Sequence, residues 1–381
     1  MEKSFSFWEQ TSFLENFDVL VVGGGLVGLM AAYQTKKQNH RLKVGVLEAG
    51  FLPSGASTKN AGFACFGSIS EMLDELESTS EDELLEVVEL RWKGLRLLRE
   101  ILGDDAIDYL PYGGFEVFKK SDRAFAEKCQ EQIGHFNRLL APITGTADIY
   151  AATGPVFITE QGLGDVHSVI QNKLEGQLDT GKMMLNLQRL VQEVGVLLFT
   201  NCKVEEIEAG SPHHTVHTNQ TKFIARKIIL ATNAFSKSLF PELNIIPGRG
   251  QVLVTGPIPG LKLRGAFHYD RGYYYFRNIG DRILIGGGRN LDFKAEETTD
   301  MGLTALVQNR LEDLLYEVVL PGQKPKIEYR WSGIMAFGDE LKPLIGEVVP
   351  GVYSAIRCNG MGVAMGSQMG KTVAELVLSS L

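Results

Sequence analysis

Three glycines, Gly23, Gly25 and Gly28, follow a short apolar run and open an apolar helical segment. In that context the first glycine permits a tight turn, the second lets a pyrophosphate approach the backbone, and the third lets helix and strand pack closely. Glu48 lies about 20 residues further on, where a carboxylate accepts hydrogen bonds from ribose hydroxyls and repels a 2′-phosphate. The free N–H groups of the helix start attract phosphates. Residues 19–48 therefore predict a dinucleotide site, for FAD or NAD.

A second group of residues could recognise an anion. Period-2 alternation along an expected strand places Tyr273, Tyr275 and Arg277 on one face. An arginine with a neighbouring phenol can hold a carboxylate through a bidentate ion pair and a hydrogen bond. Arg249, which has glycine on both sides, is a second candidate. The alternative is an exposed sheet face with a solvated arginine.

Other constellations for catalysis are missing from the sequence. We find no convincing Ser/His/Asp triad, paired carboxylates or metal-ligand spacing, so no metal is expected. His268 could act as a base, but a lone histidine in a β-rich region more often has a structural role. The cysteines, Cys65, Cys129, Cys202 and Cys358, show no CxxC spacing, which argues against zinc and disulfides and fits a reducing cytoplasm.

Elements that could position these residues follow from the hydrophobic pattern. The apolar run 20–22, the helical segment Leu26–Tyr33 and the strand Lys43–Leu47 form a βαβ unit. A loop rich in Gly, Ser, Ala and Asn follows over residues 51–67. Further expected elements are helices starting at Ser80 and Thr180, strands between residues 196 and 231, a mostly β region from Gly250 with a hairpin turn at residues 278–281, and a strand at 352–356 before a last helix.

Bulk properties limit the partners. A chain of 381 residues with 44% hydrophobic residues can bury a core of two packed domains or one large one. The net charge of −8, without a dense run of Lys and Arg, argues against nucleic acid. The apolar stretch Val19–Ala32 is too short to span a bilayer, and Met1–Gln10 lacks a secretory pattern. We therefore expect a cytoplasmic protein without membrane insertion.

Four segments together resemble the D-amino-acid oxidase-like family of flavoproteins, which includes glycine oxidase, sarcosine oxidase and gamma-glutamylputrescine oxidase. They are Val21–Gly28 with Leu47-Glu48-Ala49, the loop Gly55–Gly62, the strand and turn Ile228–Ala234, and Asn359–Ala364 before the last helix. Their order and separations match the family along most of the chain. This resemblance favours FAD over NAD.

The resemblance implies a two-domain α/β fold, with a discontinuous Rossmann-like FAD-binding domain and an α+β substrate domain built on a mainly antiparallel sheet. The expected FAD-binding segments are 1–85, 151–245 and 331–381, and the expected substrate-domain segments are 86–150 and 246–330. It also implies noncovalent FAD, bound by Gly23, Gly25, Leu26, Val27, Gly28, Glu48, Ala49, Ser57, Lys59, Asn60, Ala61, Gly62, Val204, Ala231, Thr232, Gly333, Gly360, Met361, Gly362 and Val363. Arg277, Tyr275 and Arg249 are the candidates for the substrate side.

The resemblance is closest to the gamma-glutamylputrescine oxidase branch, through Asn60-Ala61-Gly62, Tyr275-Phe276-Arg277 and Phe7-Trp8-Glu9. One departure concerns oxygen. Sarcosine oxidase-like members place a lysine near the flavin, whereas the corresponding strand here reads Ile283-Leu284-Ile285. A dehydrogenase that passes its electrons to another acceptor is therefore an alternative to an oxidase. The motif around Cys358 does not match that of the covalent flavoproteins.

The expected reaction is oxidation of a C–N bond in a small amine or amino acid to an imine, by hydride transfer to flavin. Flavin chemistry of this kind requires orientation of the substrate more than a strong acid/base pair. Two alternatives remain open: an NAD-dependent dehydrogenase, or an FAD-binding component of a larger modification or electron-transfer assembly. The sequence does not indicate the oligomeric state.

Overall fold

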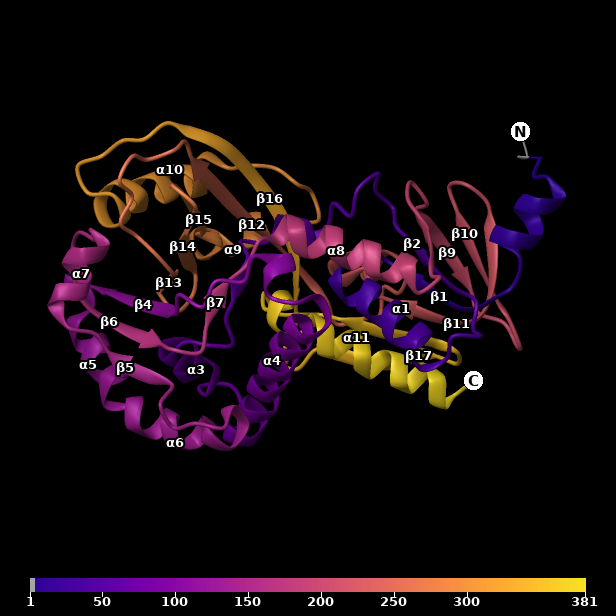
Figure 1. The fold of residues 1–381 in the computed structure, drawn as a ribbon, viewed down its shortest axis with the longest axis horizontal. Helices are drawn as coiled ribbons and strands as arrows, with labels where there is room; N and C mark the ends of the chain where they lie inside the picture. Colours follow the sequence, from indigo (N-terminus) through magenta and orange to yellow (C-terminus); the bar gives the residue numbers. More distant parts are fainter. Residues whose placement is uncertain (1–3) are drawn as a thin grey trace.

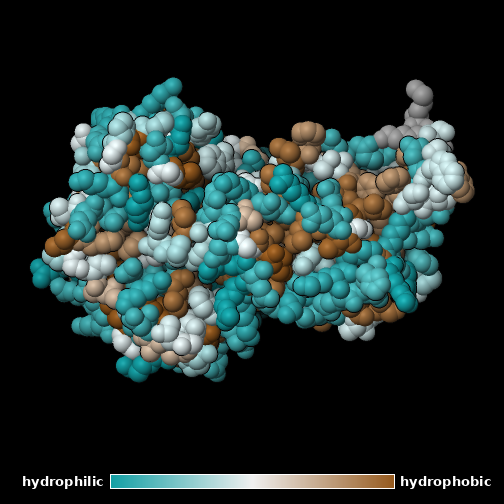
Figure 2. Space-filling model, viewed as in Figure 1, coloured by the Kyte–Doolittle hydropathy of each residue, from teal (hydrophilic) through white to brown (hydrophobic). Residues whose placement is uncertain are grey.

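The computed structural model describes residues 4–381 and has two lobes along its long axis. Each lobe is built around an eight-stranded sheet, and the long helix α4 lies at the junction (Figure 1). The surface in Figure 2 is mainly hydrophilic, with scattered hydrophobic patches. No helix within residues 4–381 is long and apolar enough to cross a membrane.

The first sheet holds the predicted βαβ unit. Its main path runs β17-β18-β11-β1-β2-β8, with β10 and β9 attached beyond β11. The strands are β1 (Phe17–Val22), β2 (Val44–Leu47), β8 (Leu197–Phe199), β9 (Val204–Glu208), β10 (His214–Thr218), β11 (Lys222–Leu230), β17 (Leu344–Val349) and β18 (Val352–Ile356). β1 pairs in parallel with both β2 and β11, as in a Rossmann-like sheet.

Three helices pack together beside this sheet: α1 (Leu26–Gln38), α8 (Thr180–Glu193) and α11 (Gly362–Ser379). α1 runs five residues beyond the predicted end at Tyr33, because the polar Gln34 and Thr35 are themselves buried. α4 (Glu81–Leu102) begins at the predicted Ser80, which forms a capping box with Glu83, and it crosses α11 closely at Gly94. A Cβ at Gly94 would lie 2.1 Å from the carbonyl oxygen of Ala364, so only glycine fits this crossing.

The second sheet is mainly antiparallel, as predicted, and runs β16-β12-β15-β14-β13-β4-β6-β5. Its strands are β4 (Gly114–Lys119), β5 (Tyr150–Ala152), β6 (Val166–Asn172), β12 (Ile246–Thr255), β13 (Ala266–Tyr269), β14 (Tyr274–Ile279), β15 (Arg282–Gly287) and β16 (Ile327–Phe337). The predicted hairpin turn is confirmed, since Ile279 pairs with Arg282 across Gly280-Asp281. One face packs against α10 (Ala305–Leu314), and we call the opposite face, which carries Tyr275, the inner face.

Smaller elements connect the two sheets. The loop predicted over residues 51–67 contains α2 (Ala56–Lys59) and β3 (Phe63–Ala64), which pairs with β7 (Gly176–Gln177). The other helices are α3 (Ile69–Glu75), α5 (Arg123–Glu131), α6 (Ile133–Thr144), α7 (Pro155–Gln161) and α9 (Phe293–Glu296). Neither α5 nor α6 was predicted, because α5 is mostly polar and α6 has Pro142 inside it.

The chain alternates between the two sheets, which confirms a discontinuous arrangement. Two predicted segment boundaries are wrong in detail. The boundary at residue 150 falls inside β5, and β6 also pairs within the second sheet. The boundary at residue 330 falls inside β16, which forms a long ladder with β12. In both places the strand continues without the Gly/Pro-rich linker that marks a domain crossing.

Candidate cofactor and substrate site

The glycines after β1 form a cradle that a side chain would fill. Gly23 has φ of +109°, and a Cβ there would lie 2.7 Å from the carbonyl oxygen of Ala231. A Cβ at Gly28 would lie 2.0 Å from the Gly23 carbonyl oxygen, and one at Gly25 would lie 2.8 Å from Ser57 Oγ. The backbone contacts therefore require glycine at Gly23 and Gly28, and at Gly25 a side chain would displace the Ser57 hydroxyl, as expected of a turn that a pyrophosphate approaches.

The N-terminus of α1 offers N–H groups to an anion. The N–H of Leu26 donates to Ser57 Oγ at 2.9 Å, so the second loop reaches the first helix turn. The N–H groups of Val27 and Gly28 have no acceptor within residues 4–381, and the N-cap Gly25 has no side chain to supply one. These donors and the helix dipole suit a phosphate.

Glu48 lies at the end of β2, beside the cradle. Its Oε2 accepts a hydrogen bond from the Gly24 N–H at 2.9 Å, and its Oε1 accepts one from the Gly50 N–H at 2.9 Å. The backbone around it, including exposed Ala49, is joined to the segment before β9, because the Cys202 N–H donates to the Glu48 carbonyl at 2.9 Å. Each carboxylate oxygen keeps a lone pair for ribose hydroxyls.

Three further predicted contacts, Val204, Ala231 and Thr232, lie around this end of the first sheet. Val204 begins β9 and is buried, two residues after Cys202. Ala231 follows β11, and its N–H donates to the Val22 carbonyl at 2.8 Å. Thr232 Oγ lies 2.7 Å from Ser236 Oγ. The structure thus brings these residues close to the glycine cradle.

The loop at residues 59–62 is held from both lobes. Asn60 Oδ1 accepts hydrogen bonds from the Gly62 N–H at 2.8 Å and from Thr180 Oγ at 2.9 Å. The Trp331 Nε1–H of β16 donates to the Lys59 carbonyl at 2.9 Å. A Cβ at Gly333 would lie 3.1 Å from Lys59 Cβ, so β16 passes directly against this loop.

Arg277 binds this loop from the second sheet. It is only 6% exposed, and its Nε donates to the Ala61 carbonyl while its Nη2 donates to the Leu178 carbonyl at 3.0 Å. Burial lowers the pKa of Arg277 to about 10. The guanidinium that we predicted to bind a substrate carboxylate therefore already holds backbone carbonyls of Ala61 and Leu178, and we do not retain the predicted role.

Tyr275 lies on the same strand with its hydroxyl free. It is half-buried, and within residues 4–381 its hydroxyl has no hydrogen-bond partner. A Cβ at Gly250 would lie 3.0 Å from Met335 Cε and 4.0 Å from Tyr275 Oη, so these three residues adjoin on the inner face. Burial raises the pKa of Tyr275 to about 12, so the phenol is a hydrogen-bond donor at neutral pH.

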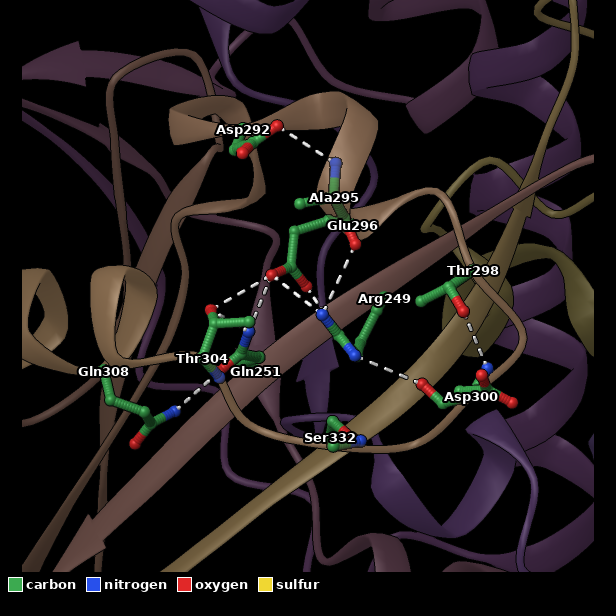
Figure 3. Close-up of polar contacts among 11 residues, drawn as sticks. Arg249, Gln251, Asp292, Ala295, Glu296, Thr298, Asp300, Thr304, Gln308 and Ser332 are labelled. Atoms are coloured by element: carbon green, nitrogen blue, oxygen red, sulfur yellow. Dashed lines mark hydrogen bonds and ion pairs between the residues drawn. The ribbon is translucent and has the colours of Figure 1, made fainter.

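Arg249 is on the wrong face for the predicted anion site. Its neighbours Gly248 and Gly250 face Phe337 and Met335, so Arg249 points to the opposite side of β12. There its Nε donates to Glu296 Oε2 at 2.7 Å, with side-chain exposures of 11% and 2% (Figure 3). The anion that Arg249 binds is therefore part of the protein.

The turn before α11 reaches the same inner face. Gly360 has φ of +82°, and a Cβ there would lie 3.9 Å from Met335 Sδ and 4.0 Å from Phe337 Cε1. Met361 is the N-cap of α11 without a side-chain hydrogen bond, and the N–H groups of Gly362 and Val363 find no acceptor in the described chain. A helix N-terminus of this kind stabilises negative charge beside it.

Residues 283–285, where the sequence was expected to depart from the family, lie in β15. Ile283, Leu284 and Ile285 are almost fully buried, and Leu284 packs with Ala61 and Val252 on the inner face. This strand therefore supplies an apolar wall beside the loop and no lysine.

A buried polar cluster escaped prediction. His268 and the carboxylates of Glu116 and Glu175 line a small cavity of about 10 Å³, the size of one water. Burial raises the pKa of Glu116 to about 7, while Glu175 Oε1 accepts the N–H groups of Phe66 at 2.8 Å and Gly67 at 3.1 Å. Cys65 Sγ, a Glu175 oxygen and a His268 nitrogen lie within 4.8 Å of one another. The cluster fixes the segment after β3, and only His268 and Cys65 were singled out from sequence.

The residues present fit FAD. The glycine cradle, the free N–H groups of α1, Glu48, the loop at residue 60 and the free N–H groups of α11 form a continuous series from the first sheet to the second. A nicotinamide dinucleotide would use the first three features and leave the last two without a function.

Comparisons with known proteins agree with this arrangement. The FAD dependent oxidoreductase family, DAO, matches residues 18–376. Gamma-glutamylputrescine oxidoreductase of Escherichia coli is 26% identical, over 94% of this chain and 83% of that protein. Glycine oxidase of Geobacillus kaustophilus is 23% identical, over 95% of this chain and 93% of that protein. The crystal structure of L-proline dehydrogenase from P. horikoshii superposes with a TM-score of 0.76 at 19% identity, covering 97% of this chain and 95% of that one. The chain belongs to the DAO family of FAD-dependent oxidoreductases.

Proposed function

We propose that this FAD-dependent oxidoreductase oxidises a C–N bond of a small amine or amino acid to an imine, which water then hydrolyses. Bound FAD supplies the acceptor for the hydride that leaves the amine carbon. The observation that carries the proposal is the glycine-lined inner face at Gly248, Gly250 and Gly333, next to the loop and helix turn that fit the flavin. The side chains of Phe337, Met335 and Lys59 pack over these glycines, and the ring and a small substrate would bind beside them.

The residues of the inner face orient the substrate and exclude water. The Tyr275 hydroxyl donates a hydrogen bond to a polar substrate group, while Met335, Phe337 and Leu284 supply apolar walls. Arg277 keeps the Ala61 carbonyl and the following Gly62 in place beneath them. No side chain is needed to remove a proton from an amine that reacts in its neutral form.

The family names and the cofactor loops favour C–N oxidation over the alternatives. Curated relatives are named a glycine oxidase and a gamma-glutamylputrescine oxidoreductase, and a structural relative is named an L-proline dehydrogenase. An FAD-binding component of a larger assembly remains the second candidate. It would hold FAD without being reduced by any free amine.

The visible spectrum of the purified protein tests the proposal, followed by anaerobic titration with amines, N-methyl amino acids and 2-hydroxy acids. We expect a bound flavin that one class of amine bleaches. A colourless protein that cannot be reconstituted with FAD would refute the proposal. A flavin that no amine bleaches would favour the assembly component instead.

The electron acceptor and the location are further parts of the proposal. With Ile283, Leu284 and Ile285 in place of a lysine-bearing strand, we propose that another acceptor competes with oxygen for the electrons. Comparing reoxidation of the bleached protein by oxygen and by an artificial quinone checks this. We also propose a cytoplasmic location, in keeping with cysteines that are all buried.

A further inference from the structure

A cleft in the lobe of the second sheet lies between α3, α5 and the ends of β4 and β13 (Figure 1). It has a volume of about 390 Å³, which is within the usual range for small-molecule sites. Exposed residues on its walls, Ser121, Ala124 and Arg271, show that it opens to solvent. We call it the α3–α5 cleft. None of the residues that fit FAD lines it.

Glu116 forms the buried end of the cleft. It is only 5% exposed, and it lines both the cleft and the one-water cavity beside His268. Its carboxylate accepts a hydrogen bond from Ser68 Oγ at 3.4 Å and one from the Ser70 N–H at 3.3 Å. Both distances are long for hydrogen bonds to a charged group. Within residues 4–381 Glu116 also lacks an ion-pair partner, so its charge is poorly compensated when it ionises.

Ser70 places a second unsatisfied oxygen at the same end of the cleft. The residue is 1% exposed, and its Oγ makes no hydrogen bond with the rest of residues 4–381. Because the Ser70 N–H donates to Glu116, the hydroxyl and the carboxylate are neighbours. A ligand with N–H groups could donate to both oxygens and would satisfy two buried acceptors at once.

The charges around Glu116 leave the cleft acidic. Asp122 and Asp270 also line it, against the single cation Arg271. That guanidinium is already paired with Asp74 at 3.3 Å and with Asp270 at 3.9 Å. Other titratable groups face Glu116 from the surrounding elements: Glu71 of α3, Cys129 of α5, Tyr150 of β5, His268 of β13 and Glu175 beyond β6. His268 faces the carboxylates of Glu71 and Glu175 as well, so it does not neutralise Glu116 alone.

The shape of the cleft suits an organic cation better than a metal ion. Among the described residues, the cleft carboxylates do not belong to any group whose three ligand atoms lie within 4.8 Å of one another. The remaining walls include the rings of Phe118, Phe125 and Tyr269. Aromatic rings pack against apolar groups and attract a neighbouring positive charge. A ligand with a charged end and an apolar body matches both parts of the cleft.

We propose that the α3–α5 cleft binds a small organic ammonium ion. Its N–H groups donate to Glu116 and Ser70, and its apolar part lies against Phe118, Phe125 and Tyr269. A protein that oxidises amines would then hold a second amine at a place where no oxidation occurs. The inference does not depend on the proposed reaction, because it concerns binding alone.

The proposed site is separate from the flavin site. Glu116, His268 and Tyr275 are direct neighbours in one row across β4, β13 and β14. Two strand spacings, about 10 Å, therefore lie between Glu116 and Tyr275. The ring of Phe63 closes the space between them, with its centroid 5.3 Å from that of His268 and 5.5 Å from that of Tyr275.

Calorimetric titration of the oxidised holoprotein tests the proposal with amines that a flavin cannot oxidise. In tert-butylamine and cumylamine the carbon next to the nitrogen carries no hydrogen, and both are ammonium ions at neutral pH. The corresponding tertiary alcohols have the same shape without the charge. At pH 8 we expect the ammonium ions to bind about 10-fold more tightly than the alcohols, and cumylammonium more tightly than tert-butylammonium.

Two variants and the pH dependence identify the partner of the ammonium ion. Glu116→Gln should weaken ammonium binding by about 10- to 100-fold and leave the alcohols unchanged. Glu127→Gln removes an exposed carboxylate of α5 that does not line the cleft, and it should change neither series. Burial raises the pKa of Glu116 to about 7, so the wild type should bind the ammonium ions about 10-fold more weakly at pH 6 than at pH 8.

Other results would overturn the inference. Ammonium ions that bind no better than the alcohols would show that the cleft does not recognise the charge. Binding that survives Glu116→Gln, or that is equal at pH 6 and pH 8, would remove Glu116 as the partner. If binding changes the flavin spectrum and is insensitive to Glu116→Gln, the amine lies at the flavin instead. The pH dependence of the wild type decides the matter even if Glu116→Gln does not fold.

Discussion

Replacing Arg277 with methionine distinguishes between two roles. The sequence predicted that Arg277 binds a substrate carboxylate, whereas in the structure Arg277 holds the loop at Ala61. The side chain loses two hydrogen bonds to distant parts of the chain, one to the Ala61 carbonyl and one to the Leu178 carbonyl. Hydrogen bonds to a charged group contribute about 1.5–3 kcal/mol each, or about 3–6 kcal/mol for the pair. Burial offsets part of this, because a pKa lowered from 12.5 to about 10 corresponds to roughly 3 kcal/mol against the charged form. The free energy of unfolding should therefore fall by only about 0–3 kcal/mol.

FAD binding should change more than stability does. In the wild type Arg277 already holds the backbone at Ala61 and Gly62 in place. Without Arg277 this backbone becomes ordered only when FAD binds, so the binding free energy of FAD includes the cost of ordering it. Ordering two residues costs about 2–3 kcal/mol, which corresponds to roughly 30- to 150-fold in the FAD dissociation constant. We expect Arg277→Met to release FAD on gel filtration, with Arg282→Met as the control. If FAD affinity is unchanged while carboxylate affinity falls, then Arg277 is the anion site after all and the structural reasoning is refuted.

Three other substitutions follow from the site. Glu116→Gln should stabilise the protein by up to about 3 kcal/mol at pH 8 and hardly at pH 5. The pKa of Glu116 is about 7 in the folded protein and 4.5 in the unfolded chain, so ionising Glu116 lowers the free energy of unfolding as the pH rises between these values. Denaturant melts at both pH values measure the difference. Tyr275→Phe should lower kcat/KM by about 10-fold with normal FAD content; unchanged kinetics would exclude the phenol from the site. Glu48→Ala should weaken FAD binding by about 10-fold, seen by fluorescence titration.

The sequence was sufficient to predict those parts of the fold in which neighbouring residues determine the backbone conformation. Gly23 and Gly28 show why, since each lies so close to other backbone atoms that only glycine fits, and this requirement is visible as a spaced motif. The two-residue turn at Gly280-Asp281 is a similar case. The crossing of β5 and β6 into the second sheet could not be predicted, because their partners lie far away in the chain and no linker composition marks the transition.

The sequence could not predict which groups the side chains of the site form hydrogen bonds with. Arg277 was expected on the correct face, but nothing local shows that the carbonyl of Ala61, 216 residues away, would occupy its guanidinium. The cluster of Glu116, Glu175 and His268 arises from three separate strands and loops in the same way. Such residues become recognisable only when the strand order of the second sheet is known.

The prediction that Arg249 binds an outside anion could have been avoided from the sequence alone. On a strand, neighbouring residues point to opposite faces, so an arginine between two glycines lies on the side away from the glycine strip. If the strip is where the flavin and substrate approach, Arg249 must belong to the other side and needs an internal anion, which Glu296 provides.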